Sequence, residues 1–293
     1  MTLNKSNPDP SRAGLPAVDW RALTVLTAIL LIGPACGRVQ SDRQTGGQRL
    51  SAPAPQAAST ASIPVGPEHV LARLPHDPEA STQGLQFWNG HFIESTGGYG
   101  TSSLRLVEPE SGRVLQREDL PRHLFGEGCA WTPAGIYQLT WRNRMVYLYD
   151  PETLQRIAAF RYPREGWGLL YDGEFLWAGD GSHRLYRLHP ETLRTEGEIE
   201  VRTRDGRPVE RLNEMAWVEG RILANVFMEN HIVEIDPDSG LARRKWDLSR
   251  LVEEERPSDP EHVLNGIAYD PETGRLWITG KRWRQVYQVE LPD

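Results

Sequence analysis

The chain has 293 residues and a formal net charge of −7 at neutral pH, so its composition gives no reason to expect a nucleic-acid partner. It has only two cysteines, Cys36 and Cys129, which excludes a disulfide-built scaffold. No phosphate-binding loop, Cys-x-x-Cys pair or His-x-x-x-His pair is found, so a catalytic metal held by a recognisable ligand motif is not expected.

The N-terminal segment has the features of a targeting signal. Residues 22–32 are apolar but fall short of the roughly 20 residues that a membrane span needs, and they fit the core of a secretory signal. Cys36 follows small residues, as in the lipobox of bacterial lipoproteins, although Gly33 stands where an aliphatic residue is usual. Lipidation of Cys36, simple cleavage and an uncleaved anchor all remain open. We predict that residues 1–36 are a signal peptide or lipoprotein signal.

This signal predicts an exported protein, periplasmic or extracellular, that meets a membrane only through the N-terminal segment or a lipid on Cys36. Residues 37–67 are rich in Ser, Ala, Pro and Gln and predict a flexible, disordered linker. Residues 68–293 remain as one domain of roughly 225 residues, which is enough to bury a sizeable core. Nothing in this part indicates an obligate partner, so we expect a monomer.

One short motif recurs five times in this domain, with starts 40 to 52 residues apart. Each copy has a polar or indole side chain first, then a small residue (glutamate once), then an apolar residue, and an aromatic residue four places after the start. The copies are Gln83–Phe87, Glu127–Trp131, Trp167–Tyr171, Asn213–Trp217 and Asn265–Tyr269. A period in the forties with strand-like composition is typical of β-propeller blades.

Further strands follow each copy of the motif. A second apolar strand comes next, and then an alternating strand that in four units closes on a proline turn such as Asp150-Pro151-Glu152. In the fifth unit the proline turn, 270–274, comes one hairpin earlier. Long helical patterns are absent after residue 70. The sequence therefore predicts an all-β, five-bladed β-propeller.

The first position of the motif differs chemically from blade to blade. Innermost strands line the channel of a propeller, so these side chains should meet at one of its ends. The ends of the adjacent strands should lie close to them. The two predicted sets are Gln83, Glu127, Trp167, Asn213 and Asn265, and Thr96, Trp141, Asp180, Phe227 and Lys281. The sets contain no serine–histidine pair, which argues against hydrolysis through an acyl-enzyme.

Each of these residues also has a structural interpretation. Trp141 and Trp167 break the repeat with a large ring, which favours binding, whereas Trp131 and Trp217 occupy the repeated aromatic position and are expected in the core. Glu127 and Lys281 could be catalytic or could only form polar pairs. Asn213 and Asn265 are expected to tie inner strands together. Cys129 is expected to fill the core, and Glu94 and Asp180 are expected to be structural.

Eight ordered motifs across residues 70–293 resemble the plant and bacterial glutaminyl cyclases, or glutaminyl-peptide cyclotransferases. The motifs are Thr82–Leu85, Glu94–Gly100, Phe125–Gly128, Gln138–Trp141, Gly166–Leu169, Leu212–Glu214, Val263–Ala268 and Thr279–Lys281. The resemblance implies a five-bladed propeller that is unrelated to the zinc-dependent animal enzymes. It also implies conversion of the N-terminal glutamine of a peptide or protein to pyroglutamate, with release of ammonia.

The resemblance also implies roles for individual residues. Glu127 matches the family's acid/base carboxylate, and Trp141 and Trp167 match its aromatic walls. Phe227 stands where the family usually has tryptophan, so this wall loses an indole N–H. The positions that match the family's polar substrate contacts are Gln83, Asn213 and Lys281, of which Lys281 could also polarise the reacting carbonyl.

Two other functions remain open on the sequence. A propeller with the same pocket could bind a peptide or glycan without chemistry. A lactonase-like propeller could instead hold calcium through Glu127, Asn213 and Asn265, because carboxylate and amide oxygens are ligands that calcium prefers. We expect no catalytic cofactor, while a structural calcium ion in the channel is compatible with the cyclase interpretation.

Overall fold

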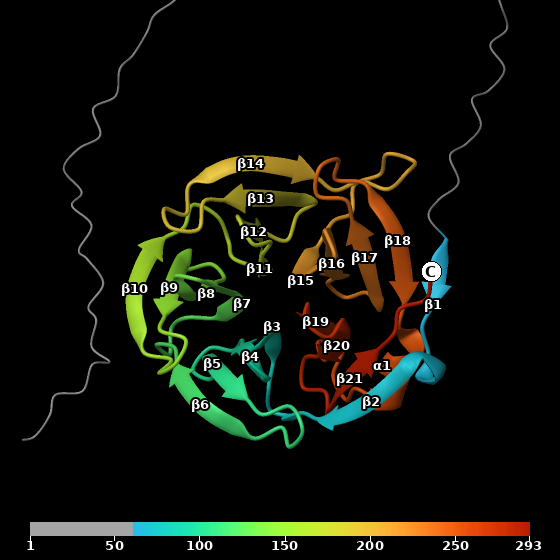
Figure 1. The fold of residues 1–293 in the computed structure, drawn as a ribbon, viewed down its shortest axis with the longest axis horizontal. Helices are drawn as coiled ribbons and strands as arrows, with labels where there is room; N and C mark the ends of the chain where they lie inside the picture. The colour runs from blue at the N-terminus through green and yellow to red at the C-terminus, as the bar shows by residue number, and fades with distance from the viewer. Residues whose placement is uncertain (1–60) are drawn as a thin grey trace, which may run out of the picture. The chain divides into compact units, whose positions relative to one another are not determined.

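The computed structural model describes residues 61–293, which form five β-sheets arranged around a common axis (Figure 1). Each sheet is one blade, and in the first three blades the strands follow chain order from the axis outward. The innermost strands β3, β7, β11, β15 and β19 face the centre of Figure 1. The predicted five-bladed β-propeller is therefore confirmed.

The first three blades are each built from one continuous stretch of chain. Blade 1 consists of β3 (Thr82–Trp88), β4 (His91–Thr96), β5 (Ser103–Val107) and β6 (Val114–Asp119). Blade 2 consists of β7 (Gly126–Thr132), β8 (Gly135–Thr140), β9 (Met145–Tyr149) and β10 (Arg156–Arg161). Blade 3 consists of β11 (Leu169–Tyr171), β12 (Leu176–Gly179), β13 (Arg184–Leu188) and β14 (Thr195–Glu200).

The last two blades each take their outermost strand from the N-terminal side. Blade 4 consists of β15 (Leu212–Val218), β16 (Arg221–Val226), β17 (His231–Ile235), β18 (Ala242–Asp247) and then β1 (Ser62–Pro64). Blade 5 consists of β19 (Leu264–Asp270), β20 (Arg275–Gly280), β21 (Gln285–Val289) and then β2 (Val70–Pro75). The fifth proline turn joins β19 to β20, one hairpin earlier than in the other blades, as predicted.

The predicted linker extends too far toward the C-terminus. Its last residues include β1, which runs parallel to β18 with Ile63 opposite Trp246, and the start of a 3₁₀ turn at Pro67–His69. Ile63 packs against the core cluster that contains Trp246, and Val65 is fully buried. Apolar burial and edge pairing therefore order this segment. Residues 1–60, with the predicted signal and Cys36, lie outside the described part of the chain.

One short helix, α1 (Ser249–Glu255), was not expected from the sequence. Leu251 of this helix is fully buried in the same cluster as Trp246. The Glu255 carboxylate accepts hydrogen bonds from the Tyr287 hydroxyl at 2.8 Å and the Arg284 backbone N–H at 2.9 Å. The helix is thus held by contacts with blade 5 that no local pattern encodes. Within residues 61–293, no helix is long and apolar enough to cross a membrane.

The innermost strands approach each other too closely for side chains at the second motif position. A Cβ atom on Gly168 would lie 1.8 Å from the Asn213 carbonyl oxygen, and one on Gly84 would lie 2.6 Å from the Cys129 nitrogen. In blade 4 this position is Glu214, whose carboxylate accepts the backbone N–H groups of Leu85 and Ile267, each at 3.0 Å. The glutamate thus links three blades across the channel.

Candidate active site

The predicted site residues lie at one end of the channel because strand pairing brings them there. Trp141, Phe227 and Lys281 directly follow β8, β16 and β20, which pair with the innermost strands. Their backbone N–H groups donate to carbonyl oxygens just before or at the start of the paired inner segments, at 3.0, 2.9 and 2.9 Å respectively. The structure therefore brings these side chains to the end of the channel where β7, β15 and β19 begin.

A buried carboxyl group and a buried lysine interact at this end. Glu127 is 6% exposed and Lys281 is 9% exposed. Burial raises the pKa of Glu127 to about 8; the charge of Lys281 opposes that rise, and Glu165 adds to it. Burial lowers the pKa of Lys281, against the charges of Glu127 and Glu261. Burial thus brings the pKa values of the two groups closer together than they are in water.

Aromatic rings extend from the lysine. The Lys281 Nζ atom lies 4.7 Å from the centre of the Phe227 ring, which meets the Trp167 ring edge-on at 5.7 Å. A Cβ atom on Gly181 would come within 2.4 Å of the Trp167 indole, so a glycine is required there. Phe227 thus keeps the flat face that a cation–π contact needs, although it lacks an indole N–H.

Trp141 belongs to a second aromatic wall. Its ring meets Phe125 edge-on at 5.6 Å and lies under the Arg142 guanidinium at 4.0 Å. The Trp141 indole N–H donates to the Glu165 carboxylate at 2.9 Å. Glu165, which also acts on Glu127, was missed by the sequence analysis. It lies in the connection between β10 and β11, outside the repeated motif, and its nearness to Gly166-Trp167 was the only cue.

Several polar atoms at this end are buried and have no partner among the described residues. They are the Gln83 Oε1, Asn213 Oδ1 and Asn265 Oδ1 oxygens and the Trp167 Nε1 nitrogen. Asn265 does donate through Nδ2 to the Thr82 carbonyl at 2.9 Å, as expected for a residue that ties inner strands together. Unpaired buried polar atoms are costly, so three acceptors and one donor at a channel mouth suggest a ligand that pairs with them.

The backbone of Glu127 is fixed by a polar chain that the sequence did not reveal. Ser95 donates its hydroxyl to the Glu127 carbonyl, and Gln138 donates its amide to Ser95 Oγ at 2.7 Å. Tyr149 in turn donates to the Gln138 amide oxygen at 2.7 Å. These groups lie in blades 1 and 2, so the position of Glu127 depends on both blades.

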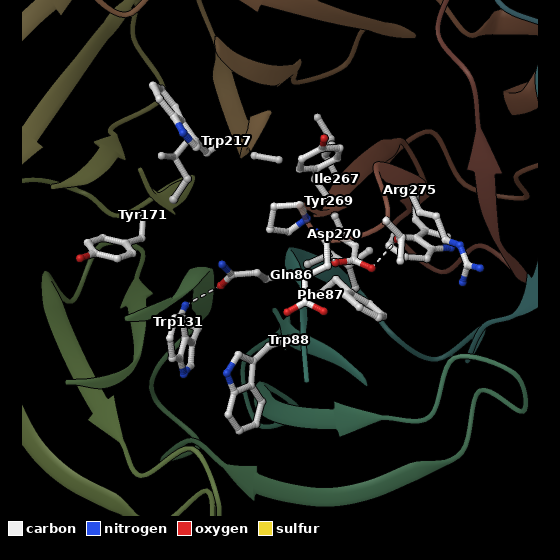
Figure 2. Close-up of a pocket in the computed structure, with 18 of the residues that line it drawn as sticks. Gln86, Phe87, Trp88, Trp131, Tyr171, Trp217, Ile267, Tyr269, Asp270 and Arg275 are labelled. Carbon is white, nitrogen blue, oxygen red and sulfur yellow. Dashed lines mark hydrogen bonds between the residues drawn. The ribbon is translucent and has the colours of Figure 1, made fainter. Parts of the chain in front are cut away.

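Trp131 and Trp217 were expected in the core, but that expectation is only half right. Each packs against a core cluster, yet each remains half-buried. Figure 2 shows both indoles around a cavity, which is lined from the C-terminal halves of the inner strands. The fifth motif position lies at the channel mouth opposite Glu127, because a strand rises roughly 3.3 Å per residue and four steps separate this position from the first.

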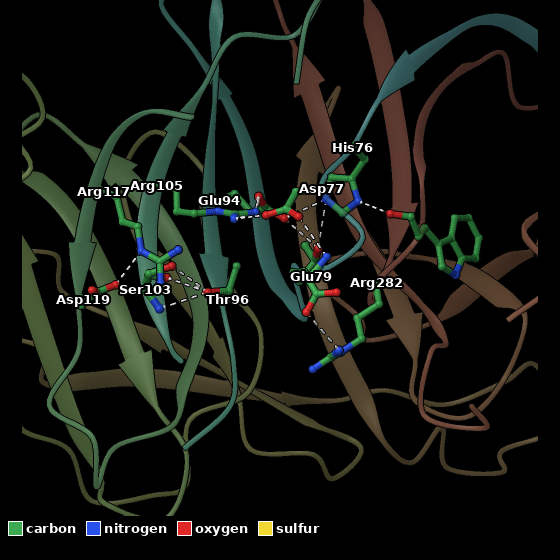
Figure 3. A network of polar contacts seen from close by, with 12 residues as sticks. His76, Asp77, Glu79, Glu94, Thr96, Ser103, Arg105, Arg117, Asp119 and Arg282 are labelled. Carbon is green, nitrogen blue, oxygen red and sulfur yellow. Dashed lines mark hydrogen bonds and ion pairs between the residues drawn. The ribbon is translucent and has the colours of Figure 1, made fainter. Parts of the chain in front are cut away.

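The other structural expectations agree with the contacts. Cys129 is 2% exposed, and burial raises its thiol pKa. Asp180 accepts hydrogen bonds from Ser182 and from the Tyr186 hydroxyl. Glu94 lies in a buried network with His76 and Arg105 (Figure 3). None of these groups joins the cluster around Glu127.

No group of three or more His, Cys, Asp or Glu side chains in residues 61–293 is placed to hold a metal ion. The oxygens at the Glu127 end of the channel are the Glu127 carboxylate and the amide oxygens of Gln83, Asn213 and Asn265.

Three comparisons with known proteins show what the chain is similar to. Residues 47–291 match the family model described as glutamine cyclotransferase. The chain is 37% identical over 229 residues to a glutaminyl-peptide cyclotransferase of Arabidopsis thaliana, covering 76% of this chain and 70% of the relative. It is also similar to the crystal structure of Myxococcus xanthus glutaminyl cyclase, with a TM-score of 0.72, 37% identity, and coverage of 76% of this chain and 95% of that one.

Proposed function

This chain belongs to the glutamine cyclotransferase family, and on that premise we propose that it converts the N-terminal glutamine of peptides and proteins to pyroglutamate at the Glu127 end of the channel. The observation that supports this site most strongly is a buried carboxyl group with a pKa of about 8, beside a buried lysine. Such a group can both accept and return a proton at physiological pH.

The reaction is an intramolecular acyl transfer. The α-amine nitrogen of the glutamine attacks the carbonyl carbon of its own side-chain amide, and a five-membered lactam forms. The bond from that carbon to the amide nitrogen breaks, and ammonia leaves. Both reacting groups belong to one residue, so the main task of the protein is to fold the side chain back and hold it.

Glu127 carries the proton between the two nitrogens. The reaction starts from the form in which the amine is neutral and Glu127 is protonated. The carboxyl group donates its proton to the departing nitrogen, and the resulting carboxylate accepts the proton that the attacking nitrogen loses. An α-amino group has a pKa near 8, so the amine and Glu127 compete for the same proton with nearly equal strength. Proton transfer between groups of matched pKa has little thermodynamic cost.

Lys281 and the unpartnered side chains bind the polar parts of the substrate. The Lys281 ammonium beside Glu127 stabilises negative charge that develops on the carbonyl oxygen during attack. Buried amide oxygens of Gln83 and Asn213 accept from the substrate amine and from the leaving NH₂ group. The unused Trp167 indole N–H donates to a substrate carbonyl.

The aromatic walls hold the aliphatic part of the glutamine. Trp141 is fixed by Phe125 and Glu165, and Trp167 is fixed by Phe227 and by the space at Gly181. Rigid rings on two sides restrict the side chain to folded conformers, which lowers the entropic part of the barrier.

The decisive experiment measures ammonia release and mass change with a glutaminyl peptide. Glu127→Gln keeps the size and polarity of the side chain but cannot exchange a proton. We expect its kcat to fall by about 10²- to 10⁴-fold, with little change in KM. Glu196→Gln, at an exposed residue of β14, is the matched control and should behave as the unmodified protein.

Two results would contradict the proposal. Near-full turnover by Glu127→Gln would remove this residue from proton transfer. Saturable binding of the glutaminyl peptide by the unmodified protein, with the glutamine left intact, would instead favour a binding propeller without chemistry.

A calcium ion is the alternative use of the same oxygens, because three buried amide oxygens lack partners beside a carboxylate. The reaction proposed above needs no metal, so activity should survive extensive treatment with a chelator. Activity lost to the chelator and restored by calcium would assign the amide oxygens to a cation instead.

The location of the enzyme also belongs to this proposal. The apolar run at residues 22–32 and Cys36 support export to the periplasm or the outside of the cell, with or without a lipid anchor. We also propose that the protein is a monomer. Mass analysis of the mature protein from membrane and soluble fractions would distinguish an acylated Cys36 from a cleaved signal.

A further inference from the structure

A cavity opens at the mouth of the channel opposite Glu127, and no step of the cyclisation uses it. Its volume is about 1280 Å³, above the roughly 300–1,000 Å³ of ordinary ligand pockets. Every blade contributes an aromatic ring near the end of its innermost strand, and blade 1 contributes two (Figure 2). The six rings are Phe87, Trp88, Trp131, Tyr171, Trp217 and Tyr269. All six are half-buried, so each has surface left for a ligand.

The floor of this cavity separates it from the active site. It is formed by the apolar residues at the third motif position, which are at most 3% exposed: Leu85, Cys129, Leu169, Met215 and Ile267. The Glu214 carboxylate spans the channel at this level through Leu85 and Ile267. A molecule in the cavity therefore does not reach Glu127, and the two mouths are independent sites.

The charge around the aromatic rings is negative. Five carboxylates and one guanidinium line the cavity, a net charge of −4: Glu110, Asp172, Glu219, Asp270 and Glu272 against Arg275. None of these six residues forms an ion pair with another residue of the described range, 61–293. Glu110 and Glu272 are exposed, so their charges face the solvent at the mouth.

Hydrogen bonds hold two of the rings. The Tyr269 hydroxyl donates to the Glu219 carboxylate at 3.1 Å, and the Tyr171 hydroxyl donates to the Gly173 carbonyl at 2.8 Å. Gln86 accepts the Trp131 backbone N–H and so fixes blade 2 against blade 1 at this mouth (Figure 2). The cavity is therefore a built arrangement of aromatic faces and negative charge, which together attract cations.

We propose that this cavity binds a peptide segment carrying lysine or arginine side chains. The basic groups would lie over the aromatic faces and pair with the carboxylates at the rim, and the alkyl stems would cover the apolar floor. The volume exceeds what one side chain fills, which favours a segment of several residues over a single cation. Net negative charge distinguishes this occupant from a neutral glycan, which would need no such excess.

The test measures binding to the full chain by titration calorimetry. The probe is an acetylated hexapeptide of alternating glycine and lysine or arginine, which has no free N-terminal glutamine and cannot be cyclised. We expect saturable binding that weakens at high salt. The double variant Glu110→Gln/Glu272→Gln should weaken it by about 3- to 10-fold, because exposed ion pairs contribute modestly.

Controls keep the result specific to this mouth. Glu196→Gln removes one exposed charge elsewhere and should leave the affinity unchanged. Trp217→Phe keeps a ring but shortens the aromatic face and should weaken binding, while Glu127→Gln should not. Cyclisation of a short glutaminyl peptide should proceed at the normal rate in both the rim variant and Trp217→Phe.

Three outcomes would overturn the assignment. One is no measurable binding of the basic peptide at low salt. Another is equal binding of the same hexapeptide with glutamate in place of its basic residues, or of a neutral cello-oligosaccharide. The third is unchanged affinity in the rim double variant, which would place any binding elsewhere on the molecule.

Discussion

Two charges act in opposite directions on the buried carboxyl group of Glu127. Burial provides most of the rise in its pKa, Lys281 opposes that rise, and Glu165 reinforces it. The substrate amine titrates in the same range. A single proton shared between these two groups gives a bell-shaped dependence of kcat/KM on pH, with its maximum at the mean of the two pKa values, near pH 8.

Removing either neighbouring charge should therefore move this maximum in a predictable direction. Lys281→Met removes the positive charge, raises the pKa of Glu127 and shifts the maximum to higher pH. Glu165→Gln removes a negative charge, lowers that pKa and shifts the maximum to lower pH, while its amide oxygen can still accept from Trp141. A pH series of kcat/KM for both variants checks the signs. Shifts in the same direction for both would mean that Glu127 does not set either limb.

The sequence located the residues of this site unevenly. Glu127, Asn213 and Trp167 could be predicted because they occupy one place in a repeat and differ there. Glu165 could not, because it lies in a connection that has no period. For Trp131 and Trp217 the repeat was misleading. A position that is aromatic in every blade predicts packing in the core. At a channel mouth, however, such a ring packs on one side and faces a cavity on the other.

At the scale of elements, the contact between blades 5 and 1 is reinforced by a buried polar network (Figure 3). His76 donates to the Trp283 carbonyl at 2.7 Å through Nδ1, so its Nε2, 2.9 Å from Glu94, must donate as well. His76 is therefore an imidazolium. Arg105 pairs with both Glu94 and Asp77. The network joins the segment after β2 to β4 and β5.

The pKa values of the network have opposite consequences for stability. Burial alone would raise the pKa of Glu94, but the charges and hydrogen bonds of His76 and Arg105 lower it to about 2. Its contribution to stability is therefore full above the unfolded value of about 4.3, and is lost as pH falls toward 2. The pKa of His76 is raised by Glu94 against burial, so its contribution is full below about pH 6.5 and is lost at higher pH.

Glu94→Gln should therefore destabilise the fold by about 3–5 kcal/mol at neutral pH, because it leaves two buried cations without their shared carboxylate. The variant should also lose less stability than the unmodified protein between pH 4.3 and 2. Urea unfolding across this range measures both effects, with Glu196→Gln as the exposed control. A loss below about 1 kcal/mol would mean that the network does not hold the two blades together.

The alternation of the strands and their proline turns were enough to predict the blades. They could not predict α1 or the ordering of Ser62–Pro64. Both depend on partners far away in the chain: Tyr287 for the helix and Trp246 for the strand. Contacts of this kind form only after the blades have brought distant residues together, so local sequence patterns do not indicate them.

At the scale of the whole molecule, closure of the ring depends on β2, which pairs with β21 and places Leu74 opposite Val286. A chain that begins at His76 lacks β1 and β2 and leaves the outer edge of β21 unpaired. We expect it to aggregate or to lose cooperative unfolding. A chain that begins at Ala61 keeps every strand of the five blades and should unfold in one transition. Circular dichroism during heating compares the two. Cooperative unfolding of the shorter chain would show that blade 5 is stable without its outer strand.

This same pairing has a consequence for synthesis. The residues of β2 leave the ribosome about 210 positions before those of β21, a delay of roughly 10 to 40 s at ordinary elongation rates. Through that time blades 1 to 4 can assemble, but the strand that completes the circle has nothing to pair with. The ring can therefore close only after β21 has emerged, and a chaperone that shields the unpaired strand β2 until then would raise the yield of active enzyme more than one that acts on the growing blades.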